Sequence, residues 1–160
     1  LKAVTQENNS NLVINRLFGL TGKYIQNTQP YALAEFIQCA LENKPIEIWS
    51  NRLVYRRFVN DRELSRLMLA MSLTGKSALF DSGGELIELR QLAIRVVNTL
   101  NSKSEISSQE VTDQAADTYY SKSDDYEKLF ATHVNSYPLT LDQQIQITAE
   151  GILQLKSGRK

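Results

Sequence analysis

The chain has 160 residues, of which 42% are hydrophobic and 22% charged, so it is long and apolar enough to bury a core and is most simply one domain. Its 18 basic and 18 acidic residues balance, which excludes the overall positive field that draws proteins to nucleic acid or to an anionic membrane, and we expect neither partner. The single cysteine, Cys39, excludes an internal disulfide. Because His133 is the only histidine, the two residues offer no metal-ligand cluster.

The amino-terminal segment predicts the end of a helix followed by a buried strand. Leu1 and Val4 lie on one apolar stripe, which the polar run 8–11 breaks, so residues 1–9 resemble the last turns of a helix and we expect the sequence to begin inside an element. Residues 12–14 form a short apolar run typical of a strand buried on both faces of a parallel sheet. We see no signal-peptide pattern and no long apolar run, so the expected location is the cytoplasm.

A helix and a short strand are predicted next. Pro30 opens a helix whose apolar stripe covers 33–41, and Cys39 within that stripe is expected in the core. Apolar and other residues alternate over 46–48, which predicts a brief strand that meets the next element across a turn at 50–52.

The stretch 53–59 predicts a strand that carries two arginines. Alternation places Arg56 on the same face as Val54 and Phe58, and Arg57 on the opposite face. A guanidinium group on an apolar face is costly unless an acidic residue or a ligand satisfies it. The sequence does not decide whether an acidic residue or a bound ligand is the partner of Arg56.

A helix follows this strand directly. Asn60 with Glu63 three residues later resembles a capping box, and apolar positions then repeat at helical spacing over 64–71. Both arginines would lie within one turn of this helix N-terminus, which favours anions, and guanidinium groups suit bidentate contact with phosphate. The pattern favours a phosphate-binding function.

The middle of the chain repeats the order of strand, turn and helix. Residues 78–80 predict a second buried strand, 81–84 a turn, and 89–100 a helix with a regular apolar stripe. The turn Asp-Ser-Gly-Gly is similar to the nucleophile loop of trypsin-like proteases, but that site needs an upstream His and the only one, His133, lies downstream. A phosphate cradle made by backbone N–H groups is the other functional alternative to a plain turn.

The last third is less regular. The polar segment 102–116 predicts at most an edge strand at 106–111, and a helix is predicted near 124–133. Thr140 and Gln143 form a second capping box that begins the last helix. The alternation of short strands and helices indicates an α/β fold.

Three stretches resemble the signature patterns of one family. Residues 16–23 are similar to a strand end of the form R-x-F-N-x-Y-G-P, with Gly19 in place of the Asn that touches substrate and Thr21 in place of the aromatic residue. Residues 56–65 are similar to R-D-F-I-Y-V-D-D-L-A, and 80–85 to the turn Y-N-V-G-S-G-E. Together they resemble the C-terminal half of the NAD-dependent epimerase/dehydratase family, the extended short-chain dehydrogenases.

The resemblance covers nearly the whole chain and implies its fold and organisation. The expected fold is the C-terminal part of a Rossmann-like extended short-chain dehydrogenase. Residues 1–160 would form a single α/β substrate-binding lobe and would be a fragment of a longer protein. Residues 1–22 would end the nucleotide-binding sheet and 23–160 would form the substrate-binding lobe. The missing N-terminal nucleotide-binding half would be the partner of this chain, and a homo-oligomer is expected.

The resemblance also implies a function and its residues. The lobe would hold a nucleotide-sugar against the nicotinamide of an NAD(P)-dependent epimerase, dehydratase or reductase of polysaccharide biosynthesis. Arg56 would bind the diphosphate, Gly19 and Thr21 would bind substrate, and Leu17 and Phe18 would lie at the cofactor. NAD or NADP would act in the complete protein, whereas this chain alone is expected to bind neither cofactor and to be inactive.

Departures from the family pattern keep a second hypothesis open. The Gly-rich dinucleotide motif and the Y-x-x-x-K catalytic pair do not occur in this sequence, and 111–117 contains no second phosphate-binding arginine. The alternative is a degenerate, non-enzymatic family member that acts as a binding or assembly module.

Overall fold

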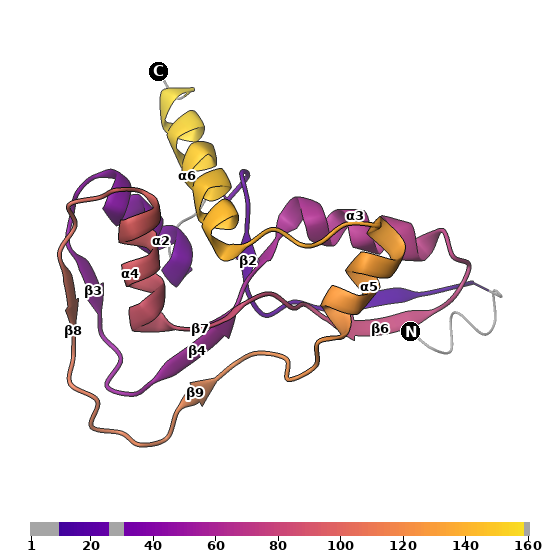
Figure 1. Ribbon diagram of the computed structural model, residues 1–160, viewed down its shortest axis with the longest axis horizontal. Coiled ribbons are helices and arrows are strands. Elements are labelled where there is room, and N and C mark those ends of the chain that lie inside the picture. Colours follow the sequence, from indigo (N-terminus) through magenta and orange to yellow (C-terminus); the bar gives the residue numbers. More distant parts are fainter. Residues whose placement is uncertain (1–9, 26–30, 159–160) are drawn as a thin grey trace.

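The structure is a computed structural model that describes residues 10–25 and 31–158. The helix expected at 1–9 and the start of a helix at Pro30 lie outside these residues. Short strands and helices alternate, as the sequence predicts, and they gather into two groups with α6 standing between them (Figure 1). In chain order the elements are β1 (Val13–Arg16), β2 (Leu20–Thr21), α2 (Ala32–Leu41), β3 (Ile46–Ile48), β4 (Val54–Arg57), β5 (Val59–Asn60), α3 (Asp61–Ser72), β6 (Ala78–Asp81), β7 (Leu86–Glu88), α4 (Leu89–Thr99), β8 (Ile106–Ser108), β9 (Asp117–Thr118), α5 (Asp125–Val134) and α6 (Leu141–Ser157).

The larger core, which we call the α2–α4–α6 core, lies where those three helices meet. The apolar stripes predicted from the sequence form it, and Cys39 packs against it half-buried. The stripes work because residues three and four apart share one helix face and can be removed from water together. Its buried members are Leu33, Phe36, Ile37, Ala40, Ile46, Ile48, Phe58, Ile87, Leu92, Ala93, Val96, Leu141, Ile145, Ala149 and Ile152.

The smaller core, which we call the α3–α5 core, packs these two helices on β1 and β6. The predicted parallel pairing of the two strands is confirmed, with Val13 opposite Ala78. The expectation that both strands are fully buried is wrong for the described residues, because Phe80 faces this core while Leu79, on the opposite face, is 65% exposed. Its buried members are Val59, Leu67, Met71, Phe80, Tyr126 and Phe130.

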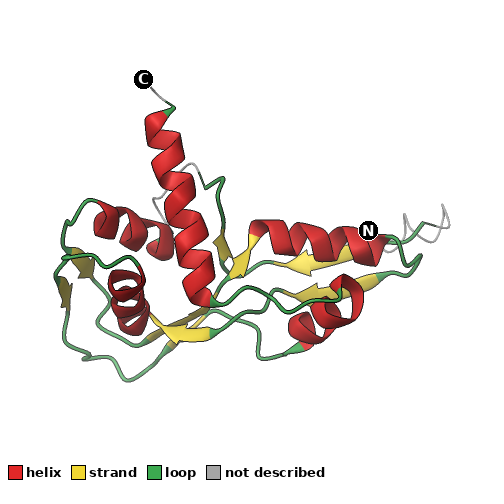
Figure 2. Ribbon diagram, turned by 45° about the horizontal axis from the view of Figure 1, so that its top comes forward, coloured by secondary structure: helices red, strands yellow, loops and turns green. Residues whose placement is uncertain are grey.

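Short sheets link the two cores. β4 lies in the centre of a three-stranded sheet, antiparallel to β7 and parallel to β9. The predicted order holds, because β3 leads through the turn at 50–52 to β4, but β3 pairs in parallel with β8 and not with β4. Within residues 10–25 and 31–158, the helices lie around several small sheets and not around one continuous central sheet (Figure 2).

The two predicted capping boxes have different outcomes. The box at Thr140 and Gln143 is present in full at the start of α6. Asn60 caps α3 by accepting hydrogen bonds from the backbone of Arg62 and Glu63, as predicted. The Glu63 carboxylate does not return to the cap, because it accepts the backbone N–H of Leu139 at 2.9 and 3.0 Å. This contact fixes the segment before α6 on the first turn of α3.

Candidate anion-binding site

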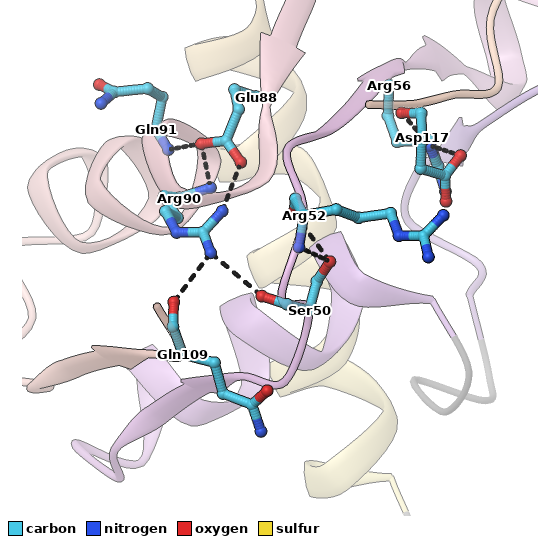
Figure 3. Close-up of polar contacts among 8 residues, drawn as sticks. All are labelled: Ser50, Arg52, Arg56, Glu88, Arg90, Gln91, Gln109 and Asp117. Atoms are coloured by element: carbon cyan, nitrogen blue, oxygen red, sulfur yellow. Dashed lines mark hydrogen bonds and ion pairs between the residues drawn. The ribbon is translucent and has the colours of Figure 1, made fainter. Parts of the chain in front are cut away.

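Arg56 has an acidic partner within the chain. The parallel register of β4 and β9 sets Val54 opposite Asp117, which brings the Asp117 carboxylate to the guanidinium of Arg56. The pair is bidentate, with Nη1–Oδ1 at 3.0 Å and Nη2–Oδ2 at 2.8 Å (Figure 3). The Arg56 side chain is 26% exposed and that of Asp117 43%. The hydrogen bond from Arg56, with the charges of Arg56 and Arg52, holds the pKa of Asp117 below its usual value.

Two aromatic rings form a surface beside Arg56. The rings of Phe18 and Tyr119 meet edge to face, 5.1 Å between centroids, and the Arg56 guanidinium lies 6.0 Å from the centre of the Tyr119 ring. The backbone N–H of Phe18 donates to the hydroxyl of Ser82, which fixes the end of β1 against the end of β6. An arginine over an aromatic face is favoured by cation–π attraction. The arrangement gathers a cation and exposed aromatic surface from three distant stretches.

A second arginine lies near this pair. Arg52 forms an ion pair with Asp113 at 2.6 Å, and it lies on the same side of the close-up as Arg56 and Asp117 (Figure 3). Arg90 forms a separate group, in which it contacts Glu88 and donates to the backbone oxygens of Ser50 and Gln109. Arg90 therefore holds the 50–52 turn against the segment that follows β8.

The other predicted site residues are placed unequally. Leu17 is 44% exposed, next to Phe18. A Cβ at Gly19 would lie 2.5 Å from the backbone oxygen of Arg57, so only glycine allows this approach of the two backbones. Thr21 is fully buried, and its hydroxyl lies 2.7 Å from Gln144 Oε1 and 3.3 Å from the backbone oxygen of Val59. In this structure Thr21 connects β2 to α6 and has no exposed atom with which to contact a ligand.

The turn after β6 holds an internal carboxylate. Gly84 adopts a φ of +102°, and its N–H donates to Glu127 Oε1 at 2.7 Å. A Cβ at Gly83 would lie 2.4 Å from the same oxygen. The phosphate cradle considered for this turn is therefore occupied by Glu127 from α5. Ser82 is buried and bonded to Phe18, which gives no support to a nucleophile loop.

A separate groove lies between the start of α3 and α6. It has a volume of about 960 Å³ and shares no lining residue with the Arg56 surroundings. Within the part of the chain that the structure describes, no three His, Cys, Asp or Glu side chains come together as a metal site, and no helix has the length and apolar character needed to cross a membrane. The groove is lined by Lys23, Tyr24, Asn60, Asp61, Arg62, Glu63, Ser65, Arg66, Leu139, Ile147 and Glu150.

Sequence reasoning proposed Arg56 and Phe18 as site residues but did not name Tyr119 and Asp117, which lie beside them. Tyr119 and Asp117 lie in a segment with no apolar periodicity, and the strand β9 that positions Asp117 has only two residues. The weak signal available was the unpaired charge of Arg56, which required some acid or ligand without saying which.

The architecture defines a class of protein: an α/β domain of short parallel strand pairs and helices, with an arginine and aromatic side chains beside the carboxyl end of β1. Comparison with solved structures shows that this is the fold of extended short-chain dehydrogenases, as predicted. The chain matches no protein-family model and no curated protein.

The solved structures that resemble the chain are about twice its length. Pal from Bacillus thuringiensis has a TM-score of 0.71 at 21% identity, covering 96% of this chain and 49% of that one. A dTDP-glucose 4,6-dehydratase from Bacillus anthracis, in complex with NAD, has a TM-score of 0.70 at 14% identity, covering 97% and 49%. A UDP-glucose 4-epimerase from Thermotoga maritima, with UDP-glucose, has a TM-score of 0.71 at 15% identity, covering 97% and 50%. The chain thus spans about half the length of these proteins, consistent with the predicted C-terminal half.

Proposed function

We propose that this chain is the substrate-binding lobe of an NAD(P)-dependent epimerase, dehydratase or reductase that acts on a nucleotide-sugar. The observation that carries the proposal is the partly exposed Arg56, whose two terminal nitrogens face one carboxylate in fork geometry beside the exposed Tyr119 ring. The same geometry suits a phosphate group. The fold shared with nucleotide-sugar epimerases and dehydratases supports the same function.

The proposed roles follow from where the residues lie. Arg56 would bind the diphosphate, and Gly19 would leave its backbone close to the sugar. Leu17 and Phe18, at the end of β1, would present apolar surface to a bound nicotinamide ring, which supplies the hydride chemistry in the complete protein. Thr21 would act indirectly, because its buried hydrogen bonds hold β2 in place. Holding the sugar in one orientation is the contribution that a lobe of this kind makes to rate.

The proposal includes the partners of the chain. Residues 10–22, with β6, would close the sheet of an N-terminal nucleotide-binding half. The exposed Leu79 on the open face of β6 supports a covering partner at this position, since a strand in such a fold is normally covered on both faces. Assembly into a homo-oligomer and a cytoplasmic location remain part of the proposal.

One observation favours the alternative of a non-enzymatic binding module. Arg56 is already satisfied by Asp117, and an arginine with a structural partner has no need of a ligand. In that case Arg56 would matter for folding and not for nucleotide binding.

Substitution of Arg56 separates the two functions. In the complete protein, Arg56→Ala is expected to weaken UDP binding by about 1.5–3 kcal/mol, the range for hydrogen bonds to a charged group, measured by calorimetric titration. Its stability loss should be about 1 kcal/mol, because both partners are solvent-accessible. Arg57→Ala is the matched control, since Arg57 pairs with Asp124 instead. Unchanged UDP affinity with a large loss of stability at Arg56 would support the structural module.

A further inference from the structure

Four charged side chains form a compact group, which we call the Arg52–Arg56–Asp113–Asp117 quartet. Its two cations and two anions pair as Arg52–Asp113 and Arg56–Asp117. The charges cancel, so the quartet presents no net field to an approaching anion. Arg56 Nη1 also donates to the backbone oxygens of Tyr55 and Asp117, so this nitrogen is held within the chain by three oxygens.

The backbone of the acidic segment is held independently of its carboxylates. The N–H groups of Thr112 and Asp113 donate to the backbone oxygen of Asn51, and the N–H of Asp117 donates to that of Leu53 at 2.8 Å. The Asn51 amide also donates to the Thr112 hydroxyl. Because these bonds fix the main chain, the Asp117 side chain can rotate off Arg56 without loss of the β4–β9 pairing.

All four side chains are partly accessible to solvent. If Asp117 left Arg56, a second cation, Arg52, would lie nearby. The Asp117 carboxylate is 43% exposed and the Arg52 side chain 44%. The pKa of Asp117 is lowered mainly by its hydrogen bond to Arg56, and the charge of Arg52 acts in the same direction. A displaced Asp117 carboxylate would have water and the nearby Arg52 to compensate the loss of Arg56.

We propose that the Asp117 carboxylate is a built-in competitor for the ligand's phosphate: it holds Arg56 in the free protein and is displaced when a nucleoside diphosphate binds. The inference rests on the proposed function and deepens it. The planar fork of Arg56 accepts a carboxylate or a phosphate through the same two N–H···O bonds, so the two anions exclude each other. Asp117 thereby reduces the affinity of the site for anions, so an anion that binds Arg56 more weakly than Asp117 does is excluded.

The test is the isosteric substitution Asp117→Asn in the complete protein, with UDP as the titrated probe and dTDP as a second nucleotide. Loss of the competing charge is expected to tighten UDP binding about tenfold, on the scale of one charge-assisted hydrogen bond. The matched control is Asp124→Asn, which removes the equivalent partner from Arg57 and should leave UDP affinity unchanged. Melting curves of both variants establish that each is folded.

The outcomes distinguish this inference from the proposed function. Unchanged or weaker UDP binding by Asp117→Asn overturns the proposal that Asp117 competes with phosphate. A loss of UDP affinity in Arg56→Ala would in that case still support nucleotide binding. Absence of UDP binding by all variants overturns both. A crystal structure of the unsubstituted protein with UDP gives an independent test that does not depend on a variant. Arg56 should there contact phosphate and not Asp117, and a retained bidentate pair with Asp117 beside bound UDP would refute the proposal.

Discussion

Thr21→Val decides whether Thr21 is structural or contacts substrate. The hydroxyl of Thr21 lies 2.7 Å from Gln144 Oε1 in a fully buried position. Valine keeps the shape but removes the donor, so the Gln144 carbonyl loses its partner at a site that is 2% exposed. Leaving a buried acceptor unsatisfied costs about 1–3 kcal/mol, and we expect a loss of about 2 kcal/mol in unfolding free energy.

Urea unfolding of the protein measures this loss, and a UDP titration is run beside it. Thr118→Val is the matched control, because Thr118 is exposed on β9 and should change stability by less than about 0.5 kcal/mol. The double variant with Gln144→Met should cost less than the sum of the two single changes, since both partners are then apolar. Unchanged stability with a loss of UDP affinity in Thr21→Val would refute the structural role and restore the substrate contact.

Two further predictions concern the close approach of α6 to Lys23 and the buried carboxylate of Glu63. Gly151→Ala should destabilise the protein by about 1–3 kcal/mol in urea unfolding, because its Cβ would lie 2.1 Å from the backbone oxygen of Lys23. Gly158→Ala is the control and should be near neutral, because its Cβ would make only an ordinary contact, 3.5 Å from the backbone oxygen of Gln154. Equal effects of the two substitutions would contradict the close approach at Gly151. Burial raises the pKa of Glu63 from its ordinary value of 4.5, so the folded state binds this proton more tightly than the unfolded state, and stability should fall as pH rises from 4.5 through the folded-state pKa. Glu63→Gln should remove that fall when urea midpoints are compared between about pH 4 and pH 8, and an identical pH dependence in both proteins would refute it.

The sequence predicted the helices of this fold because each buries one apolar stripe. The stripes of α2, α4 and α6 are regular, and the cap residues Asn60 and Thr140 mark where α3 and α6 begin. Such signals are local, since residues three and four apart are neighbours on a helix whatever the rest of the chain does.

The strand pairings and the partner of Arg56 could not be predicted in the same way. β3 pairs with β8 and β4 with β9, and strands of two or three residues carry too little alternation to reveal their neighbours. Arg56 and Asp117 are 61 residues apart, and the local sequence around either residue gives no indication that the two pair. Glu63 shows the same limit, because a contact 76 residues away, at Leu139, took the carboxylate that local spacing assigned to the helix cap.

The interleaving of the two cores has a consequence for how the chain is made. The α3–α5 core joins β1 to β6 across 65 residues and is completed by Tyr126 and Phe130, while the α2–α4–α6 core is completed by Ile145 and Ile152. Neither core can therefore close until the last helices have left the ribosome. Long-range pairings also slow folding, because the entropy of closing large loops must be lost first. We expect the nascent chain to expose those apolar surfaces of α2 and α4 that α6 covers until α6 has been made, so chaperone binding should end only after α6 has left the ribosome.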